Sequence, residues 1–308
     1  MAHVHRSAGG EDNSRRGRRL LIALALNLGI TVAELIGGLI SGSLALIADA
    51  AHNFSDAASI LASYIAWRIS QRQADKLRTF GYARAETVGA VINLTTLLLI
   101  GLYLLYEAVS RLITPTEIAS TTMLVVGVIA LVEDLAAAWV LRKETGSLNV
   151  KSTFLHMIAD AMTTVGVIIA ALAIMAWGSA FAWLDPLITG LIALYIWVHG
   201  YHEIKKSIAV LIDSAPRDFD YDGLVASLHE MAGVEDVHHL HVWQREEGKL
   251  ALEAHVALSE TDFGRATELK EAAKTRLKER FGIDHATIEI ELADKVSHDR
   301  SLLARERK

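Results

Sequence analysis

The 308-residue chain contains no cysteine and only three prolines. Without cysteine it has no disulfides, no thiolate metal sites and no cysteine nucleophile. No domain of the chain is strongly basic, which excludes a nucleic-acid-binding domain and makes nucleic acid an unexpected partner. The motif His-Glu-x-x-His is absent too, so the sequence does not indicate a zinc peptidase.

Charge is scarce in the first two-thirds of the chain. Hydrophobic residues make up 52% of the sequence, charged residues 21%, and the mean hydropathy is +0.32. Residues 1–212 contain 16 basic and 15 acidic residues, whereas residues 213–308 contain 14 and 21. The chain is too apolar throughout for disorder. It divides into a nearly neutral, apolar body and an acidic C-terminal domain.

The body contains six apolar stretches that are long enough to cross a bilayer. About 20 apolar helical residues span a hydrocarbon core of about 30 Å, where backbone groups must be paired within the segment. We therefore predict six transmembrane helices. The stretches are residues 20–41, 43–67, 85–110, 121–141, 153–177 and 180–211.

Basic residues follow the alternation expected of a membrane protein. Nearly all the Lys and Arg of the body lie in the N-terminal segment, after the second and fourth stretches, and at the end of the sixth, while the other loops contribute only Arg111. Because cytoplasmic loops carry the positive charge, we predict a multi-pass protein of the cell inner membrane with both termini cytoplasmic. The predicted parts are a cytoplasmic tail (1–18), a transmembrane domain (19–212), a cytoplasmic domain (213–295) and a C-terminal tail (296–308).

Every ionisable residue well inside a predicted span is an acid or a histidine. Such residues are rare and costly in a membrane, and by default they mark a functional site. Carboxylates and imidazoles without any buried Lys or Arg indicate a cationic substrate, which is a metal ion, protons or both. The residues are Glu34, Asp49, His52, Asp56, Glu133, Asp134, His156 and Asp160.

Two of the spans carry the same short pattern, His-x-x-x-Asp. It is formed by His52 and Asp56 in the second span and by His156 and Asp160 in the fifth. Residues four apart lie on one face of a helix, so each pair presents an imidazole and a carboxylate together. Two such helices supply two nitrogens and two oxygens for a tetrahedral site, which suits Zn²⁺, Co²⁺ and Cd²⁺ better than Mg²⁺ or Ca²⁺.

The remaining buried acids are candidates for a metal or proton path. Asp49 shares a face with His52 and is a possible outer partner or proton acceptor. Glu34 belongs to a polar stripe that either lines a water-filled path or bonds a neighbouring helix. Glu133 and Asp134 are adjacent acids in the fourth span, and either they extend this path or one of them stays protonated and faces a partner helix.

Five segments resemble the cation diffusion facilitators, and most of all the zinc-type bacterial metal/proton antiporters. The resemblance covers about residues 18–293. It implies a homodimer that exchanges divalent metal for protons, with six transmembrane helices and a cytoplasmic α+β domain of ferredoxin-like fold. The segments are SLALIADAAHNFSD (43–56), TFGYARAE (79–86), SLNVKSTFLHMIAD (147–160), VHHLHVW (237–243) and HATIEIE (285–291).

Several residue roles follow from this resemblance alone. Some family members bind a second metal in the loop after the second span, but here only Asp75 remains, with Arg78 and Tyr82 at the histidine positions, so we expect no metal there. Arg84 and Asp213 match positions that form an ionic interlock in some members. The transport site implied by the family consists of His52, Asp56, His156 and Asp160.

The acidic domain reads as helix, strand, strand, helix, strand. Its predicted elements are 219–231, 234–245, 249–258, 265–281 and 285–292. Four residues, His238, His255, Glu289 and Glu291, match a cytoplasmic metal site of the family, although they are equally compatible with solvated strand positions. His239 stands where an Asp is commoner, a change that either adds a ligand or displaces one.

The predicted function is export of divalent metal from the cytoplasm in exchange for protons, with Zn²⁺ as the expected substrate and Cd²⁺ or Co²⁺ as others. Metal and protons compete for the same ligands, which is a sufficient basis for antiport. Bound to the cytoplasmic domain, Zn²⁺ would act as a regulator. The alternatives are a Co²⁺- or Mn²⁺/Fe²⁺-preferring exporter, a membrane metalloenzyme, and a metal sensor. We do not expect an enzyme, because a fully ligated site leaves no position for an activated water.

Overall fold

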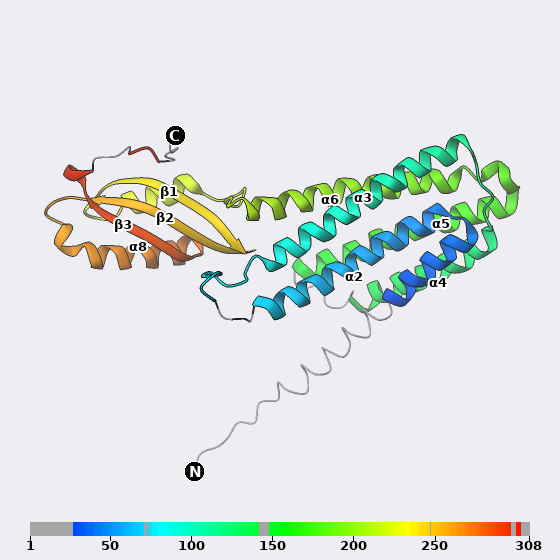
Figure 1. The fold of residues 1–308 in the computed structure, drawn as a ribbon, viewed down its shortest axis with the longest axis horizontal. Coiled ribbons are helices and arrows are strands. Elements are labelled where there is room, and N and C mark those ends of the chain that lie inside the picture. The colour runs from blue at the N-terminus through cyan, green and yellow to red at the C-terminus, as the bar shows by residue number, and fades with distance from the viewer. Residues whose placement is uncertain are drawn as a thin grey trace, which may run out of the picture. The chain divides into compact units, whose positions relative to one another are not determined.

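The computed structural model describes residues 27–70, 72, 74–141, 148–246, 248–296 and 300–302 (Figure 1). The chain forms two compact units. One comprises Met1–Tyr64 with Ile92–Ile204, and the other Ile65–Val91 with Lys205–Lys308.

Each of the six apolar stretches contains a helix. The prediction of a helical membrane domain is therefore confirmed for the described residues, although α2, α3 and α5 each extend at least three residues beyond a predicted end. The helices are Asn27–Ser41, α2 (Leu44–Ser70), α3 (Ala85–Ile113), α4 (Ser120–Leu141), α5 (Leu148–Trp177) and α6 (Leu184–Leu211).

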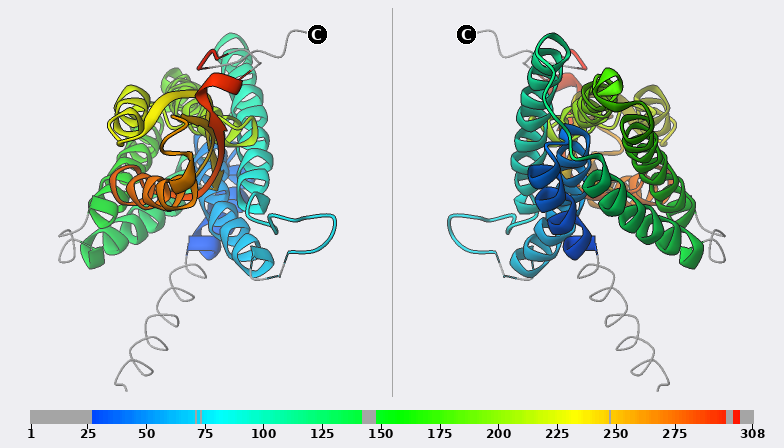
Figure 2. Two further views of the ribbon diagram at one scale, coloured as in Figure 1. Left: turned by 90° about the vertical axis from the view of Figure 1, so that its left-hand side faces the viewer. Right: turned by 90° about the vertical axis from the view of Figure 1, so that its right-hand side faces the viewer.

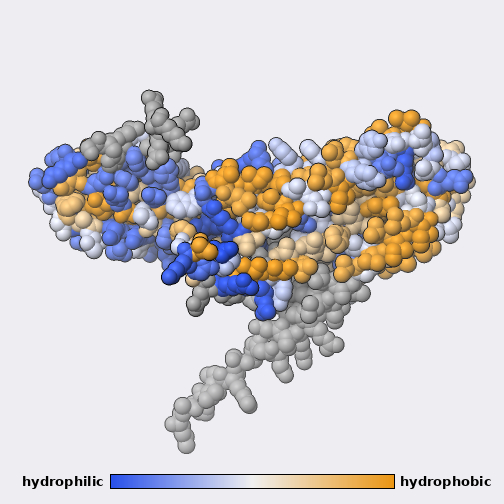
Figure 3. Space-filling model, viewed as in Figure 1, coloured by the Kyte–Doolittle hydropathy of each residue, from blue (hydrophilic) through white to orange (hydrophobic). Residues whose placement is uncertain are grey.

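The surface of these helices is suited to lipid. Three of the described helices, Ala85–Ile113, Ser120–Trp139 and Met157–Phe181, are long and apolar enough to cross a membrane, and Asn27–Ser41 is apolar but shorter. Large apolar side chains cover their outer faces, while hydrophilic side chains dominate the surface of the sheet and of α8, Ala266–Phe281 (Figure 3). A soluble protein would bury such a surface.

Small residues allow the helices to approach one another closely. Gly37 shows this most clearly, because a Cβ atom placed on it would lie 2.6 Å from the Val126 Cγ2 atom of α4. Alanines from α2, α5 and α6 fill the core between the helices, among them Ala45, Ala170 and Ala193. Helices in membranes pack in this way because dispersion contacts require close backbones.

A carboxylate of α6 caps the start of α2. Asp185 is fully buried and accepts hydrogen bonds from the Ser43 hydroxyl (2.5 Å), the Leu44 amide (2.9 Å) and the Ala45 amide (3.2 Å). The first amides of a helix lack intrahelical partners and carry partial positive charge, so a carboxylate satisfies both needs. The beginnings of α2 and α6 are thereby fixed to each other.

The acidic domain is an α+β layer, as predicted. Its three strands lie in the order β1-β2-β3, with β1 and β2 antiparallel and β2 and β3 parallel. The two helices of this domain, Tyr221–His229 and Ala266–Phe281, share one hydrophobic core with the sheet. The second of them, α8, is orange in Figure 2 and lies along the sheet. The elements are α7 (Tyr221–His229), β1 (Val234–Glu246), β2 (Lys249–Leu258), α8 (Ala266–Phe281) and β3 (Ile283–Leu292).

Strand β1 is interrupted by a bulge. Its pairing with β2 shifts between His238 and His241, and His239 has a positive φ of 46°. A bulge inserts one extra residue into a strand and changes which face the following side chains occupy. This irregularity lies in the middle of a predicted metal site.

Candidate metal sites

Helices α2 and α5 bring three of the predicted transport ligands together. The His52 Nε2 atom lies 3.1 Å from Asp160 Oδ1 and 3.8 Å from Asp56 Oδ2. One ligand atom from each of the three lies within 4.8 Å of the others. The His52 side chain is 5% exposed and that of Asp160 is 11% exposed, whereas that of Asp56 is 39% exposed, so the group has one accessible side.

The fourth predicted ligand, His156, lies on α5 one turn before Asp160. Its side chain falls outside the described residues. The regular helix nevertheless places its backbone on the same face as that of Asp160.

A second layer of polar contacts surrounds this group. Asp49 accepts hydrogen bonds from the hydroxyls of Thr163 (3.0 Å) and Thr164 (3.1 Å) on α5. The Thr164 Oγ1 atom also lies 3.0 Å from an oxygen of Asp134 on α4. A hydroxyl has one proton to donate. Thr164 therefore donates to only one of these two carboxylates at a time, whereas Asp49 also has the Thr163 hydroxyl as a donor.

Glu34 faces α2 from the first helix. It is fully buried, and its Oε2 atom accepts a hydrogen bond from the Asn53 side chain at 3.0 Å. Among the described residues its Oε1 atom has no hydrogen-bond partner. Glu133 is half-buried on α4, next to Asp134. The structure thus gives Glu34 a definite partner in the helix that carries His52.

Four polar residues of this region were not predicted from the sequence. Thr163 and Thr164 follow Asp160 by three and four positions on α5, so helical spacing from that ligand would have found them. Asn53 follows His52 directly, and Asp185 lies five residues after the start of the predicted span 180–211, outside the set of acids well inside the spans.

In the loop between α2 and α3, Asp75 stabilises a turn. It accepts hydrogen bonds from the backbone amides of Leu77 (2.8 Å) and Arg78 (2.7 Å) and from the Tyr82 hydroxyl (3.2 Å). These bonds, first that of Arg78 and then that of Leu77, hold the pKa of the Asp75 carboxyl below its usual range. Its oxygens are engaged by the loop itself.

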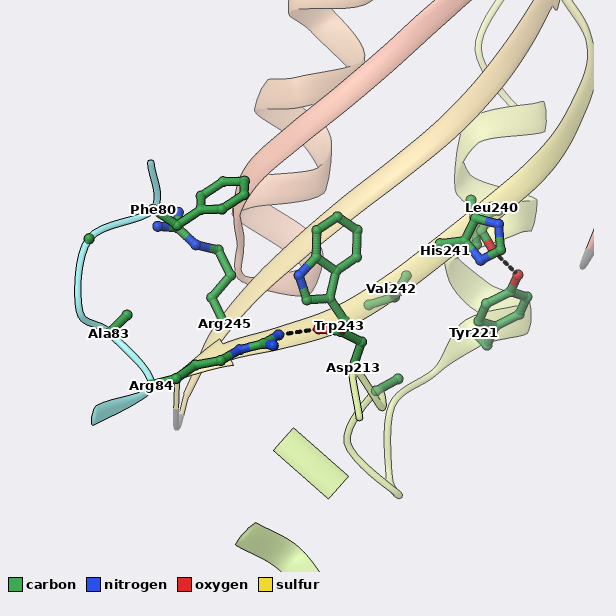
Figure 4. Close-up of a pocket in the computed structure, with 12 residues that line it drawn as sticks. Phe80, Ala83, Arg84, Asp213, Tyr221, Leu240, His241, Val242, Trp243 and Arg245 are labelled. Carbon is green, nitrogen blue, oxygen red and sulfur yellow. Dashed lines mark hydrogen bonds and ion pairs between the residues drawn. The ribbon is translucent and has the colours of Figure 1, made fainter. Parts of the chain in front are cut away.

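Arg84 and Asp213 are in direct contact, with the Arg84 guanidinium donating to an Asp213 oxygen. The pair borders an open cavity of about 710 Å³, whose wall includes Phe80 and Trp243 (Figure 4). The guanidinium of Arg245 lies 4.9 Å from the centre of the Phe80 ring. A partly exposed ion pair of this kind contributes little to stability.

A second group of ligand atoms lies on the sheet of the acidic domain. Glu291 has one oxygen 3.1 Å from His238 Nε2 and the other 3.1 Å from His255 Nδ1. These three residues place a ligand atom each within 4.8 Å of the others. Burial lowers the pKa of His238, which favours the neutral imidazole that binds metal.

The fourth predicted cytoplasmic residue, Glu289, takes a different position. Its carboxylate lies 3.6 Å from the Nε2 atom of His255, on the side of the ring away from Glu291. Asp236 stands in the same relation to His238, 3.3 Å from its Nδ1 atom. The structure therefore groups three of the four predicted residues and leaves Glu289 beside one of them.

Two family models match nearly the whole chain. The cation efflux transmembrane domain matches residues 20–212, and the cytoplasmic domain of cation efflux proteins matches residues 216–293. The chain belongs to the cation diffusion facilitator family. This confirms the predicted resemblance and identifies the chain as a membrane transporter of metal cations.

Characterised facilitators from several bacteria are similar over almost their full length. The chain is 34% identical over 307 residues to the cadmium, cobalt and zinc/H⁺-K⁺ antiporter of Bacillus velezensis, covering 98% of this chain and 96% of that one. It is 38% identical over 292 residues to the metal cation efflux system protein CzcD of Cupriavidus metallidurans, covering 94% and 90%. It is 34% identical over 297 residues to the zinc transporter ZitB of Escherichia coli, covering 94% and 93%.

Proposed function

We propose that this facilitator exports Zn²⁺, and with it Cd²⁺ or Co²⁺, from the cytoplasm in exchange for protons. The observation that carries the proposal is the convergence of His52, Asp56 and Asp160 from two helices within 4.8 Å. The names of its relatives, which include zinc, cadmium and cobalt transporters, support the same metals.

The donor set favours a metal of this class. His52 supplies a nitrogen and Asp56 and Asp160 supply oxygens. In this proposal His156, one turn before Asp160 on α5, would be the source of a second nitrogen. Two nitrogens and two oxygens satisfy the tetrahedral preference of Zn²⁺, whereas Mg²⁺ and Ca²⁺ prefer more oxygen ligands. Metal is the cargo of this site, so its ligands must also release it.

Proton exchange follows from the same ligands. Imidazoles and carboxylates bind metal only when they are deprotonated, so arrival of Zn²⁺ displaces protons and protonation displaces Zn²⁺. The site is divided between α2 and α5, and a movement of one helix against the other separates its halves. In this proposal protons or metal pass towards the site along the acids Asp49, Asp134, Glu133 and Glu34.

The proposed arrangement in the cell keeps the parts expected from the sequence. Residues 19–212 cross the inner membrane, while residues 1–18, 213–295 and 296–308 lie in the cytoplasm, which the distribution of basic residues supports. The family model that matches the cytoplasmic domain, residues 216–293, is named for dimerisation, which supports a homodimer. The Arg84–Asp213 pair would join the loop after α2 to the start of the cytoplasmic domain, and Zn²⁺ at His238, His255 and Glu291 would regulate transport.

The test is metal-driven exchange in proteoliposomes. A pH gradient should drive Zn²⁺ uptake by the wild-type protein, with protons moving in the opposite direction. Asp160→Asn should lower the initial rate of Zn²⁺ uptake by about 100-fold, because it removes a ligand and its charge. The matched control is Glu279→Gln on the exposed face of α8, which should retain the wild-type rate.

Three results would contradict parts of the proposal. A wild-type rate in Asp160→Asn would disprove the site. Uptake of Mn²⁺ but not of Zn²⁺ would disprove the metal preference. Zn²⁺ uptake without any proton movement would disprove the antiport.

A further inference from the structure

Two consecutive histidines lie on the same face of the sheet. In a regular strand, successive side chains point to opposite faces. In β1, however, Val237 and Leu240 are three residues apart and both belong to the core. The bulge between them therefore turns both His238 and His239 to the opposite face, where His255 stands across from His238 on β2.

The C-terminal segment holds this bulge in place. The backbone amides of His239 and Leu240 donate to the carbonyl oxygens of Ser301 (3.2 Å) and Leu302 (2.9 Å), and Leu302 packs against the core. A positive φ is uncommon for a residue other than glycine, although histidine tolerates it better than most. The left-handed conformation of His239 is thus fixed by hydrogen bonds on its own edge of the sheet.

The three imidazole rings are spaced as they would be around one ion. Their centroids lie 5.6 Å apart for His238 and His239, 5.4 Å for His238 and His255, and 5.0 Å for His239 and His255. On a tetrahedral Zn²⁺, with Zn–N distances of about 2.0–2.1 Å, imidazole centroids stand about 5 Å apart. The rings already stand at about this separation, although the ligand atoms that lie within 4.8 Å of one another belong to His238, His255 and Glu291 alone among the described residues, so the His239 ring must turn to join them.

We infer that His239 is the fourth ligand of a closed cytoplasmic Zn²⁺ site, completing the set formed by His238, His255 and Glu291. This inference rests on the cytoplasmic site of the proposed function and deepens it. The three-residue group alone offers three protein ligands and leaves one position open. His239 fills that position with an imidazole, and a site closed by three nitrogens and one oxygen retains its metal rather than passing it on.

The surrounding carboxylates fit this assignment. If His255 binds through Nδ1 and His238 through Nε2, the opposite nitrogen of each ring faces an acid, at 3.6 Å for Glu289 and 3.3 Å for Asp236. Carboxylates in this relation orient a metal-binding imidazole and increase its basicity. Glu289 therefore positions His255, which differs from the ligand role that the sequence predicted for it.

The test uses Co²⁺ as a spectroscopic probe of the full-length protein in detergent. Asp56→Asn and Asp160→Asn are introduced together, so that the transport site no longer competes for the ion. A four-coordinate Co²⁺ gives intense visible bands, whereas a six-coordinate one gives weak bands. The parent should show intense bands, and adding His239→Asn should weaken them and lower the Co²⁺ affinity by about 10–100-fold.

Two further variants complete the experiment. His241→Asn removes an exposed imidazole two positions along the same strand and should change nothing. His239→Gly is a second imidazole-free variant that accepts a positive φ, so it separates loss of the ligand from loss of the fold. Unchanged Co²⁺ affinity and spectrum in both His239 variants would overturn the inference. Absence of bound Co²⁺ in the parent would overturn it together with the cytoplasmic site, while Zn²⁺ export by the wild type is judged separately in proteoliposomes.

Discussion

At the scale of single residues, Asp185 shows that a buried acid in this protein can serve structure rather than transport. It binds three donors at the start of α2, and each of them is buried. Asp56 and Asp160, in contrast, face the imidazole of His52. The partner of each carboxylate distinguishes the two roles, since burial alone is common to Asp185 and Asp160.

Asp185→Ala should destabilise the protein substantially. The substitution leaves the Ser43 hydroxyl and the Leu44 and Ala45 amides without their acceptor, and one unsatisfied buried donor costs about 1–3 kcal/mol. We expect a loss of at least about 3 kcal/mol, measured as a lower melting temperature of the detergent-solubilised protein by tryptophan fluorescence. Asp185→Asn keeps one acceptor oxygen and should lose less. Equal melting temperatures for Asp185→Ala and wild type would refute the capping role.

Single residues also mark the limit of prediction from the sequence. The transport ligands could be predicted because His52 and Asp56 are four residues apart, and so are His156 and Asp160. Local spacing of this kind is visible without a fold. The partners of Asp185 and Asp49 could not be predicted, because Leu44 and Thr164 lie 141 and 115 positions away from them.

At the scale of elements, the first helix and α4 are in close contact where Gly37 meets Val126. Any side chain larger than hydrogen at Gly37 meets the Val126 side chain. Helix association in lipid depends on such contacts, since lipid tails are as apolar as the helices.

Gly37→Ala should therefore impair the protein, and a second substitution should restore it. Overpacking of a tight contact costs about 1–3 kcal/mol. Gly37→Ala should lower the melting temperature in detergent, and Gly37→Ala combined with Val126→Ala should recover most of the loss, because the second change removes the atoms that clash. Gly29→Ala is the matched control, as nothing lies within 4 Å of a Cβ at that position. A double variant as unstable as Gly37→Ala would contradict this contact.

Hydropathy was sufficient to place the long helices, because an apolar run of helical length has few alternatives. It was not sufficient for β1, which the sequence predicts as a regular strand. The bulge becomes apparent only when Val237 and Leu240 are both found in the core. Which side of a strand faces the core depends on the packing of α7 and α8, and that information is not local.

At the scale of the whole molecule, metal binding and proton binding should be linked. Ligands that carry protons must lose them before Zn²⁺ binds, so binding should release protons and Zn²⁺ affinity should fall as the pH falls. We expect Zn²⁺ added to weakly buffered wild-type protein near pH 7 to acidify the solution, as followed with an indicator dye. Asp160→Asn should release fewer protons per protein, because its membrane site no longer binds. Identical proton release by the two proteins would show that the released protons do not come from the membrane site.

The cap at Asp185 also sets the geometry of any motion at the transport site. His52 lies eight residues beyond Leu44, which at 1.5 Å per residue is about 12 Å along α2. If α2 pivots where Asp185 holds it, a tilt of about 10° displaces His52 by about 2 Å, which is as long as a Zn–N bond. The capped end would then be the pivot of α2, and a small rotation there would be enough to open or close metal coordination.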